Sequence, residues 1–566
     1  MNKSTILASL KVVNHICFSL LLLTSIHTYA KDQTKQTLLP TDSKIQNKTD
    51  STFTDYSNLN NRCTKIVTAA GKYGNTRHPD WGVFNKHSGF GPVGNYSWYA
   101  FGQYAPYAQA RWAEDWSGLC NDPHKNDDWF NRLKYIPLND SGDIWLSLNG
   151  NERFRHVFDS KPYMGFGAKT NSNRLLIRSV YGADLHIGSH VRAYAELING
   201  VAGGSNTFGY QTGFQRKRLD MQQGFLEIKG NLLGAKMGAM GGRQYFVDAP
   251  LSMTSARELT NIRYSWDGFR GYAFWKNFRV DIFDFWQTDF SKDHVFGAGP
   301  SYNARMFGGL ASYALPSFKV QNVNSQLYLD AFYIGYLYNG NAAGLPTPTP
   351  GKNRQGSTRR DNIGGRLNGN IGNFTIDVTG IYQGGEFRPA NSGSKTRPVR
   401  AYAFDAIFAY NFKNVPGNLS LGLQSDYFSG GNYHKDHGAV RNFAVPYFTT
   451  ANYQDMTLYL ATSNTVSTGP LITYNPTKKA LVKLHAPVIW RANTNDTIYG
   501  VGFNYPLRDN YSGGFVGAIP QFTLAYAIAP HLVLTGDFGG VLASQSIKKA
   551  GGNDSAFLME TLDFRF

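Results

Sequence analysis

The sequence is poor in charge, in cysteine and in long hydrophobic runs. Only 17% of its 566 residues are charged, against about 25% in an ordinary globular protein. Its mean hydropathy of -0.36 excludes a membrane protein built from several helices of about 20 apolar residues. Glycine, with 60 residues, and aromatic residues, at 14%, are abundant instead. This composition fits a large all-β protein that alternates polar and apolar residues, because averaging hides such alternation.

The long apolar run that does exist lies at the N-terminus. Lys3 and Lys11 provide positive charge, Val12 to Ile26 form an apolar core, and Thr28-Tyr29-Ala30 precede a polar stretch. This order is typical of a cleaved secretory signal. We therefore predict that residues 1–30 are a signal peptide and that the mature chain is exported. The full chain has a formal charge of +17, so the mature part stays strongly basic.

Two cysteines, Cys63 and Cys120, remain after the signal peptide has taken Cys17 with it. In an oxidising compartment two cysteines most simply form a disulfide bond, and we predict this pairing. A metal or redox pair is the alternative, although the chain has no CxxC spacing. We predict no metal site and no cofactor.

The rest of the chain divides into three regions. Residues 31–60 are polar and without periodicity, which predicts a flexible leader. Residues 61–142 are rich in glycine and tryptophan and irregular, and predict an extension that lies in the periplasm or plugs a pore. Over 143–566, polar and apolar residues alternate in segments of about 9–14 residues between turns, which is typical of a transmembrane antiparallel β-barrel.

Connection lengths support the barrel. We count about 18 strand candidates, among them 260–275 and 479–491, and an even number is expected of a bacterial barrel. Long connections such as 429–468 alternate with tight ones such as Gly372, as external loops alternate with periplasmic turns. The C-terminal strand ends in Phe566, like the signal that the barrel assembly machinery recognises. We predict a monomer in the bacterial outer membrane, in contact with its lipid and lipopolysaccharide and without nucleic-acid partners.

Alternation also predicts which side chains line the lumen and set its selectivity. Charges in a low-dielectric wall focus the field along an aqueous path, and arginine holds a carboxylate through two parallel hydrogen bonds. The set therefore predicts a basic lumen that favours anions, although any single arginine can equally brace the wall through an ion pair. Acids such as Asp377, Asp405 and Asp537 are sparser. The predicted lumen residues are Arg153, Arg155, Arg174, Arg178, Arg192, Arg243, Arg263, Asp267, Arg360, Arg366, Lys483, His485 and Arg491.

Several short motifs resemble one family. They are Gln222-Gln223-Gly224-Phe225-Leu226-Glu227, Gly241-Gly242-Arg243-Gln244, the stretch from Asn261 to Arg270, the run from Glu114 to Leu138 and the loop from Asn442 to Phe448. Together they resemble the alginate export family of outer-membrane porins over most of residues 110–566. The resemblance implies a barrel of about 18 strands whose arginine-rich constriction passes an anionic uronate polysaccharide outward. Arg243 and Arg263 match the motif positions.

The predicted function is a passive channel for an anionic saccharide or polysaccharide. Other functions compete with this prediction. A general or carboxylate-specific nutrient porin is the alternative within the same class. We predict no enzyme, because a nucleophile and a base must converge and His485 has no evident Ser or Asp partner. An energised receptor needs a larger plug and about 22 strands. An adhesive role would use the loop 429–468.

Overall fold

The computed structural model describes residues 114, 116–121, 126–166, 170–205, 213–250, 252–254, 257–289, 293–339, 356–390, 393–412, 414–417, 419–445, 457, 459–477, 479–500, 506–507 and 512–566. All of them belong to one unit, residues 61–566. The predicted signal peptide, the predicted leader and Cys63 lie outside the described residues. Within that described part, no helix is long and apolar enough to cross a membrane.

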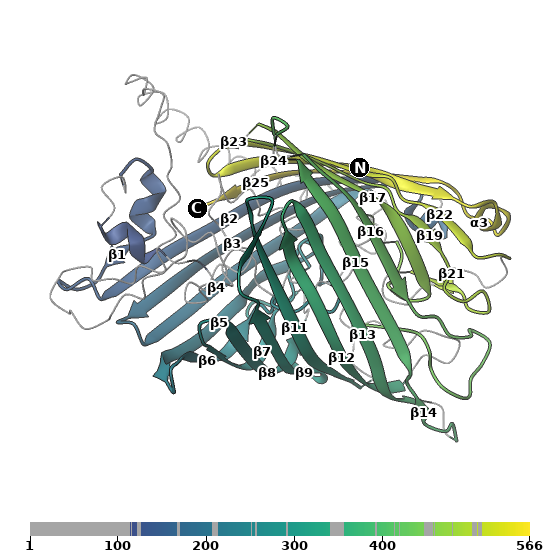
Figure 1. Ribbon diagram of the computed structural model, residues 1–566, viewed down its shortest axis with the longest axis horizontal. Coiled ribbons are helices and arrows are strands. Elements are labelled where there is room, and N and C mark those ends of the chain that lie inside the picture. Colours follow the sequence, from purple (N-terminus) through teal and green to yellow (C-terminus); the bar gives the residue numbers. More distant parts are fainter. Residues whose placement is uncertain are drawn as a thin grey trace. The chain divides into compact units, whose positions relative to one another are not determined.

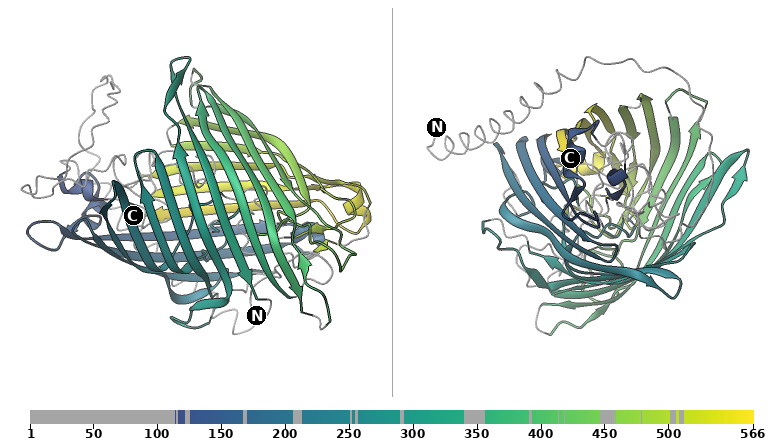
Figure 2. Two further views of the ribbon diagram at one scale, coloured as in Figure 1. Left: turned by 60° about the horizontal axis from the view of Figure 1, so that its bottom comes forward. Right: turned by 90° about the vertical axis from the view of Figure 1, so that its left-hand side faces the viewer.

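Eighteen antiparallel strands close into a barrel (Figures 1 and 2). Each strand pairs with the next one along the chain, and the last, β25 (Ser555–Arg565), lies beside the first, β2 (Ile144–Asp159). Their register runs from Asn151 opposite Arg565 to Asp159 opposite Phe557. This pairing closes the sheet on itself and removes the edges that an open sheet would expose. The predicted fold class is confirmed.

The remaining strands follow in chain order. They are β3 (Ser172–Ile187), β4 (Val191–Ser205), β5 (Lys217–Leu232), β6 (Ala235–Gln244), β7 (Trp266–Phe274), β8 (Phe278–Thr288), β9 (Pro300–Ala314), β11 (Val323–Tyr338), β12 (Gly356–Ile371), β13 (Phe374–Pro389), β15 (Ala401–Phe412), β16 (Leu419–Phe428), β17 (Thr465–Thr477), β18 (Ala480–His485) with β19 (Val488–Trp490), β22 (Phe515–Ala518) with β23 (Gln521–Ala529), and β24 (Leu532–Ala543). Each of the two composite strands is interrupted at a proline, Pro487 or Pro520, because proline cannot donate to the ladder.

Short elements decorate this framework. They are β1 (Ile136–Pro137), β10 (Phe318–Val320), β14 (Arg397–Pro398), β20 (Ile498–Tyr499), β21 (Pro506–Leu507), the helix α3 (Gln545–Lys549) and the 3-10 turns η4 (Ser117–Asn121), η5 (Trp129–Leu133) and η6 (Pro162–Gly165). The Ser544 hydroxyl caps α3 by accepting a hydrogen bond from the backbone N–H of Ile547.

The two faces of the wall have opposite chemistry. Outward side chains such as Leu226, Phe269 and Ile282 are 63%, 69% and 62% exposed. Inward side chains such as Arg178 and Arg360 are fully buried. A water-soluble sandwich buries its apolar face, whereas a barrel in lipid exposes it. The alternation read from the sequence therefore describes a wall that is apolar outside and polar inside.

The connections differ in length between the two ends of the barrel. At one end, which we call the long-loop end, β6 and β7 are joined by residues 245–265, and β16 and β17 by residues 429–464. At the other, the short-turn end, β5 and β6 are joined by Leu233-Gly234, and β12 and β13 by Gly372-Asn373. Gly234 and Gly372 have φ angles of 71° and 58°, which glycine adopts without steric cost.

Parts of the long loops fold back into the barrel. Phe246 and Met253 from one loop, and Phe443 and Val445 from another, join a cluster of buried side chains on the inner wall. The strand that we expected over 260–275 begins only at Trp266. Residues 260–265 belong instead to a loop that is buried against the inner wall. Apolar content alone did not distinguish a buried loop from a strand.

The end of the N-terminal extension packs on the short-turn end. β1 pairs with the start of β2, with Ile136 opposite Leu146. Trp116 and Leu119 form a buried cluster with the inward Trp145, and the ring of Phe130 stacks on the C-terminal Phe566 at 5.2 Å. A cavity of about 360 Å³ lies among η4, η5 and β1.

Cys120, on η4, is disulfide-bonded. Because Cys63 lies outside the described residues, its predicted pairing with Cys120 stays a prediction.

Candidate lumen site

Five of the predicted lumen arginines form one surface on the inner face of β2, β3 and β4. We call this surface the arginine wall; its members are Arg153, Arg155, Arg174, Arg178 and Arg192. None of them is more than 6% exposed. Alternation placed all five correctly, because each lies an even number of residues from its inward neighbours on the strand.

Glu258, in the loop between β6 and β7, lies at the centre of the arginine wall. Its Oε1 is 3.1 Å from Arg153 Nη1 and 2.6 Å from Arg178 Nη2, and its Oε2 accepts a hydrogen bond from Arg263 Nε. Burial alone would raise the pKa of Glu258, but the charges of Arg178, Arg263 and Arg153 hold this pKa well below its usual value. Sequence reasoning missed Glu258, because strand alternation says nothing about loops.

The same arginines also hold the loop backbone. Arg153 Nη1 donates to the carbonyl of Glu258 at 2.8 Å, and its Nη2 donates to that of Thr260 at 2.9 Å. Arg155 Nη1 donates to the carbonyl of Leu259 at 2.8 Å. Guanidinium groups carry five donors in a fixed fork, so one arginine satisfies several carbonyls of a loop that has no strand partner. These contacts fix the loop against the inner wall of the barrel.

The other members of the wall form ion pairs between neighbouring strands. Arg174 Nη2 lies 3.4 Å from Asp159 Oδ2. Arg192 Nε donates to Asp184 Oδ1 at 2.7 Å, and its Nη1 lies 3.6 Å from Glu227 Oε2. These contacts match the bracing role that we considered for any single arginine.

Two of the predicted lumen residues, Arg243 and Asp267, are on the other face. They oppose each other on β6 and β7, and Arg243 Nε lies 2.8 Å from Asp267 Oδ1. Asp267 follows the inward Trp266 and shares its face with the exposed Phe269. Arg243 Nη2 also donates to the carbonyl of Ala298, in the loop after β8. The expectation was wrong because the alternation continues unbroken through Gly242 and Gly268, so that Arg243 shares its face with the exposed Met237.

Arg360, on β12, has a different environment. Its Nη1 donates to the carbonyl of Asn442 at 3.0 Å and to Oε1 of Gln383, and both acceptors are neutral. On the next strand, Gln383 holds the same loop through Ala444, whose carbonyl accepts a hydrogen bond from Nε2 at 2.8 Å. Arg360 and Gln383 therefore hold a second loop against the inner wall, and the hydrogen bonds of Arg360 given above go to neutral acceptors.

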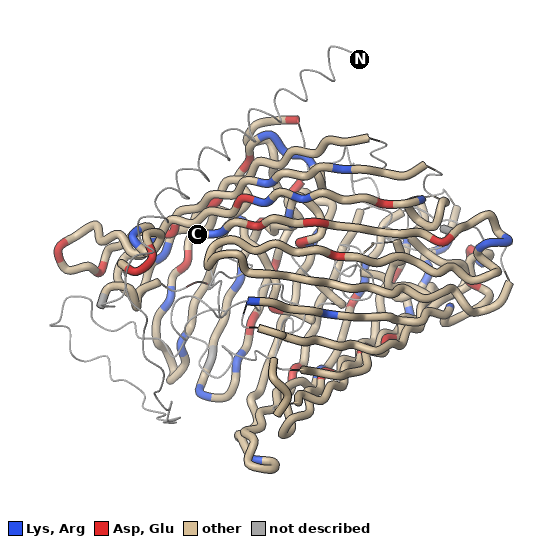
Figure 3. The backbone as a smooth tube through the Cα atoms, turned by 90° about the horizontal axis from the view of Figure 1, so that it is seen from above, with Lys and Arg blue, Asp and Glu red and all other residues tan. Residues whose placement is uncertain are grey.

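Carboxylates gather on the inner face of the strands from β11 to β16. We call this surface the aspartate wall; its members are Asp330, Asp377, Asp405 and Asp426. Arg366 binds Asp377 through two hydrogen bonds of 2.6 and 2.7 Å. Figure 3 shows that basic and acidic positions are intermingled along the strands of the barrel.

The last three predicted residues are on or next to the composite strand β18–β19. Lys483 and His485 lie on β18, where His485 opposes Leu471 and Gln521 rather than a Ser or Asp. Arg491 follows the last residue of β19 and donates to the carbonyl of Asp496 at 2.7 Å. Among the described residues, no group of three or more His, Cys, Asp and Glu side chains is arranged to hold a metal ion.

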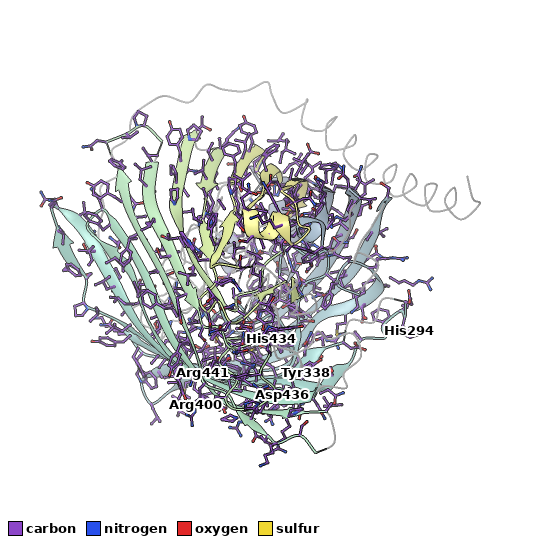
Figure 4. The ribbon with its side chains drawn as sticks, turned by 90° about the vertical axis from the view of Figure 1, so that its right-hand side faces the viewer. His294, Tyr338, Arg400, His434, Asp436 and Arg441 are labelled. Atoms are coloured by element: carbon purple, nitrogen blue, oxygen red, sulfur yellow. The ribbon has the colours of Figure 1, made fainter. Side chains whose placement is uncertain are left out.

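Sequence reasoning missed an exposed basic group at the long-loop end, because its members are in loops. Arg400, Lys435 and Arg441 are exposed, beside His434 and Asp436. Figure 4 shows Arg400, His434, Asp436 and Arg441 close together at this end, whereas His294 lies apart. We call Arg400, Lys435 and Arg441 the basic rim.

Backbone hydrogen bonds join the two segments that carry the basic rim. The N–H of Arg400 donates to the carbonyl of Val440 at 2.9 Å, and that of Val440 donates to the carbonyl of Pro398 at 2.8 Å. The chain then continues from Arg441 into Asn442, whose carbonyl binds Arg360. The basic rim therefore adjoins the inner wall at Arg360.

A comparison with protein families shows to which family the chain belongs. The family model of alginate export matches residues 144–559, nearly the whole barrel. The chain belongs to the alginate export family. No curated protein matches it.

Several solved porins are similar to this family member. A BenF-like porin from Pseudomonas fluorescens Pf-5 is 11% identical, covering 74% of this chain and 98% of that chain with a TM-score of 0.47. OccAB1 of Acinetobacter baumannii is 10% identical, covering 74% and 96% with a TM-score of 0.47. OccK2 of Pseudomonas aeruginosa, in complex with glucuronate, is 10% identical, covering 76% and 100% with a TM-score of 0.44.

Membership of the family makes this protein a channel of the bacterial outer membrane and not an enzyme. In such barrels the long loops face outward and the short turns face the periplasm. The basic rim therefore lies at the outer mouth, and the described end of the extension lies at the periplasmic mouth.

Proposed function

We propose that this channel passes an anionic saccharide of the uronate class, down its gradient and between the two walls of the lumen. The observation that carries the proposal is the basic rim at the outer mouth, directly beyond Arg360. A uronate chain repeats a carboxylate on every sugar, so it meets these cations in succession. Arginine matches a carboxylate with two parallel hydrogen bonds.

The arginine wall supports the same substrate class by a different route. Its guanidinium groups already hold the carboxylate of Glu258, which is the chemical group that a uronate offers. A substrate carboxylate that reaches this wall meets donors already arranged for a carboxylate. The ion pairs with Glu258 oppose replacement of its carboxylate by that of the substrate. The proposal therefore rests mainly on the exposed basic rim.

Planar-bilayer recordings test the proposal. We expect anion selectivity in asymmetric KCl, and block by oligouronates added on the side of the long loops, but no block by neutral maltodextrins. The double substitution Arg400→Glu and Arg441→Glu should weaken oligouronate block several-fold, because it reverses two exposed charges at the mouth. Both positions are solvent-exposed, so the barrel should still fold.

Arg388→Glu is the matched control. Arg388 is also exposed at the long-loop end, but its Nη2 already pairs with Glu386 Oε1 at 2.6 Å. It should leave the block unchanged. Cation selectivity of the unmodified channel, or equal block by maltodextrins, would refute the proposal. Equal block by monomeric uronates and by oligomers would instead favour a carboxylate-specific nutrient porin.

A further inference from the structure

Asp405 and Asp426, of the aspartate wall, are direct neighbours across β15 and β16. Register places Asp405 opposite Asp426, with Thr379 on β13 and Ser467 on β17 extending the row on either side. All four side chains point inward. Directly opposite residues have Cβ atoms about 4.5–5.5 Å apart, so the two carboxylates face each other within a row of oxygen-bearing side chains.

Burial of the two carboxylates makes their ionised state unfavourable in free energy. Asp405 is 4% exposed and Asp426 is 3% exposed. Within the described part of the chain, neither carboxylate oxygen of Asp405 accepts a hydrogen bond of good geometry, although the hydroxyl of Ser252 faces it from the β6–β7 loop. Two buried carboxylates side by side are unfavourable unless one takes up a proton or a cation lies beside them. The pair therefore favours a bound cation.

The charge of the neighbouring Arg366 acts on Asp405. Its guanidinium fork, however, is directed at Asp377, through two hydrogen bonds of 2.6 and 2.7 Å. Asp426 accepts hydrogen bonds from Ser467 Oγ at 2.7 Å and Gln424 Nε2 at 3.3 Å. The hydroxyl oxygens of Thr379 and Ser467 keep lone pairs that can coordinate a cation.

We propose that Asp405 and Asp426 together bind a Ca²⁺ ion in the lumen wall, with the hydroxyls of Ser252, Thr379 and Ser467 completing its shell. Carboxylate and hydroxyl oxygens are hard ligands, and Ca²⁺ accepts six to eight of them in flexible geometry. Mg²⁺ demands a stricter octahedron and gives up its water reluctantly. With no His or Cys in the row, softer transition metals are disfavoured.

The ion would have a role that follows from the proposed function. Arginines on one wall attract the carboxylates of a uronate chain, and a cation on the opposite wall would attract them from the other side. Binding of the ion involves no residue of the basic rim or of the arginine wall, so it is tested separately from the substrate.

The experiment measures Ca²⁺ binding by the full-length protein, purified in detergent and freed of cations with EGTA. Calorimetric titration with CaCl2 and the thermal unfolding midpoint are recorded for the unmodified protein and for the double variant Asp405→Asn with Asp426→Asn. We expect the double variant to lose one Ca²⁺ equivalent and the Ca²⁺-dependent rise of the midpoint. MgCl2 should have a weaker effect on the unmodified protein.

Asp537→Asn is the matched control. Asp537 is a fully buried inward aspartate, but its cross-strand neighbours are Thr523 and Met559 rather than a carboxylate. It should keep the Ca²⁺ response, and bound lipopolysaccharide contributes equally to all samples. A Ca²⁺ response identical in the unmodified protein and the double variant would overturn the proposal and favour a proton shared by the two aspartates.

A heat-dependent gel shift identifies the variants that fold. If the double variant does not fold, the single Asp405→Asn substitution takes its place with the same expected loss. Block of the channel by oligouronates is measured in parallel without Ca²⁺, so failure of the ion site and failure of the uronate proposal give different results.

Discussion

The arginine wall and the aspartate wall are both buried inside one barrel, yet they satisfy their charges differently. On the arginine wall, the guanidinium groups of Arg153 and Arg178, together with that of Arg263 from the loop, surround the carboxylate of Glu258, and further donors bind loop carbonyls. On the aspartate wall, Asp405 lies opposite a second carboxylate, and the nearby Arg366 is engaged by Asp377. The same alternation of strand residues thus produces one wall that is neutralised from within the chain and one that calls for an external cation.

The difference follows from the chemistry of the two side chains. Arginine is a donor, and a loop inside a barrel offers many backbone carbonyls that have no strand partner. Aspartate is an acceptor, and the backbone N–H groups of the strands are already used in the ladder. A buried arginine can therefore be satisfied by a loop, whereas a buried aspartate needs hydroxyls, arginines, a proton or a bound ion.

The largest expected effect is on the arginine wall. Glu258→Gln removes the one carboxylate shared by Arg153, Arg178 and Arg263 and leaves their buried charges uncompensated. We expect a loss of about 3–5 kcal/mol in the free energy of unfolding, the range for breaking a buried ion pair. Denaturant titration followed by tryptophan fluorescence measures it. A loss as small as that of an exposed ion pair would show that the loop carbonyls alone hold the wall.

The ion selectivity of the channel should change more when a charge is removed from the aspartate wall than when one is removed from the arginine wall. Arg366→Gln leaves Asp377 and its neighbours with less compensation, so we expect a several-fold rise in the permeability of K⁺ relative to Cl⁻. Arg155→Gln removes an equal charge from the arginine wall, where other arginines surround it, and should change this ratio less. Reversal potentials in asymmetric KCl compare the two. Equal shifts would mean that only the total lumen charge matters.

The pH dependence of stability provides a finer test of the arginine wall. The pKa of Glu258 is held well below its usual value of 4.5 in the folded state. Its contribution to stability should therefore be fully present above pH 4.5 and fall as the pH drops below that value. Unfolding midpoints measured between neutral and acidic pH should show this loss in the unmodified protein and a smaller loss in Glu258→Gln.

The smallest effect is expected outside the lumen. Lys548 and Asp554 pair at 2.8 Å but are 38% and 50% exposed. Lys548→Gln should change the free energy of unfolding by about 0–1 kcal/mol, as is usual for exposed pairs. The same denaturant titration measures it, and it serves as the control for Glu258→Gln. A larger loss would show that the helix α3 is held mainly by this pair.

Much of the site was predictable where it lies on regular strands. Arg153, Arg178 and Arg360 were placed on the inner face because side chains alternate along a strand. Arg243 and Asp267 were misplaced because the glycines beside them carry no side chain to show the phase of the strand, which in fact continues unbroken. Glu258 and Arg441 were not found, since a loop has no periodicity from which to predict a partner.

The sequence by itself determined the barrel, because a strand in lipid must alternate its chemistry and because loop lengths differ between the two ends. It also determined which strand residues face inward. Only the tertiary structure decided which charges meet, since Glu258 reaches Arg178 from a loop 80 positions away in the chain. The register between β15 and β16, which places Asp405 opposite Asp426, is likewise visible only once the strands are paired, because alternation within one strand leaves its register with the next strand open.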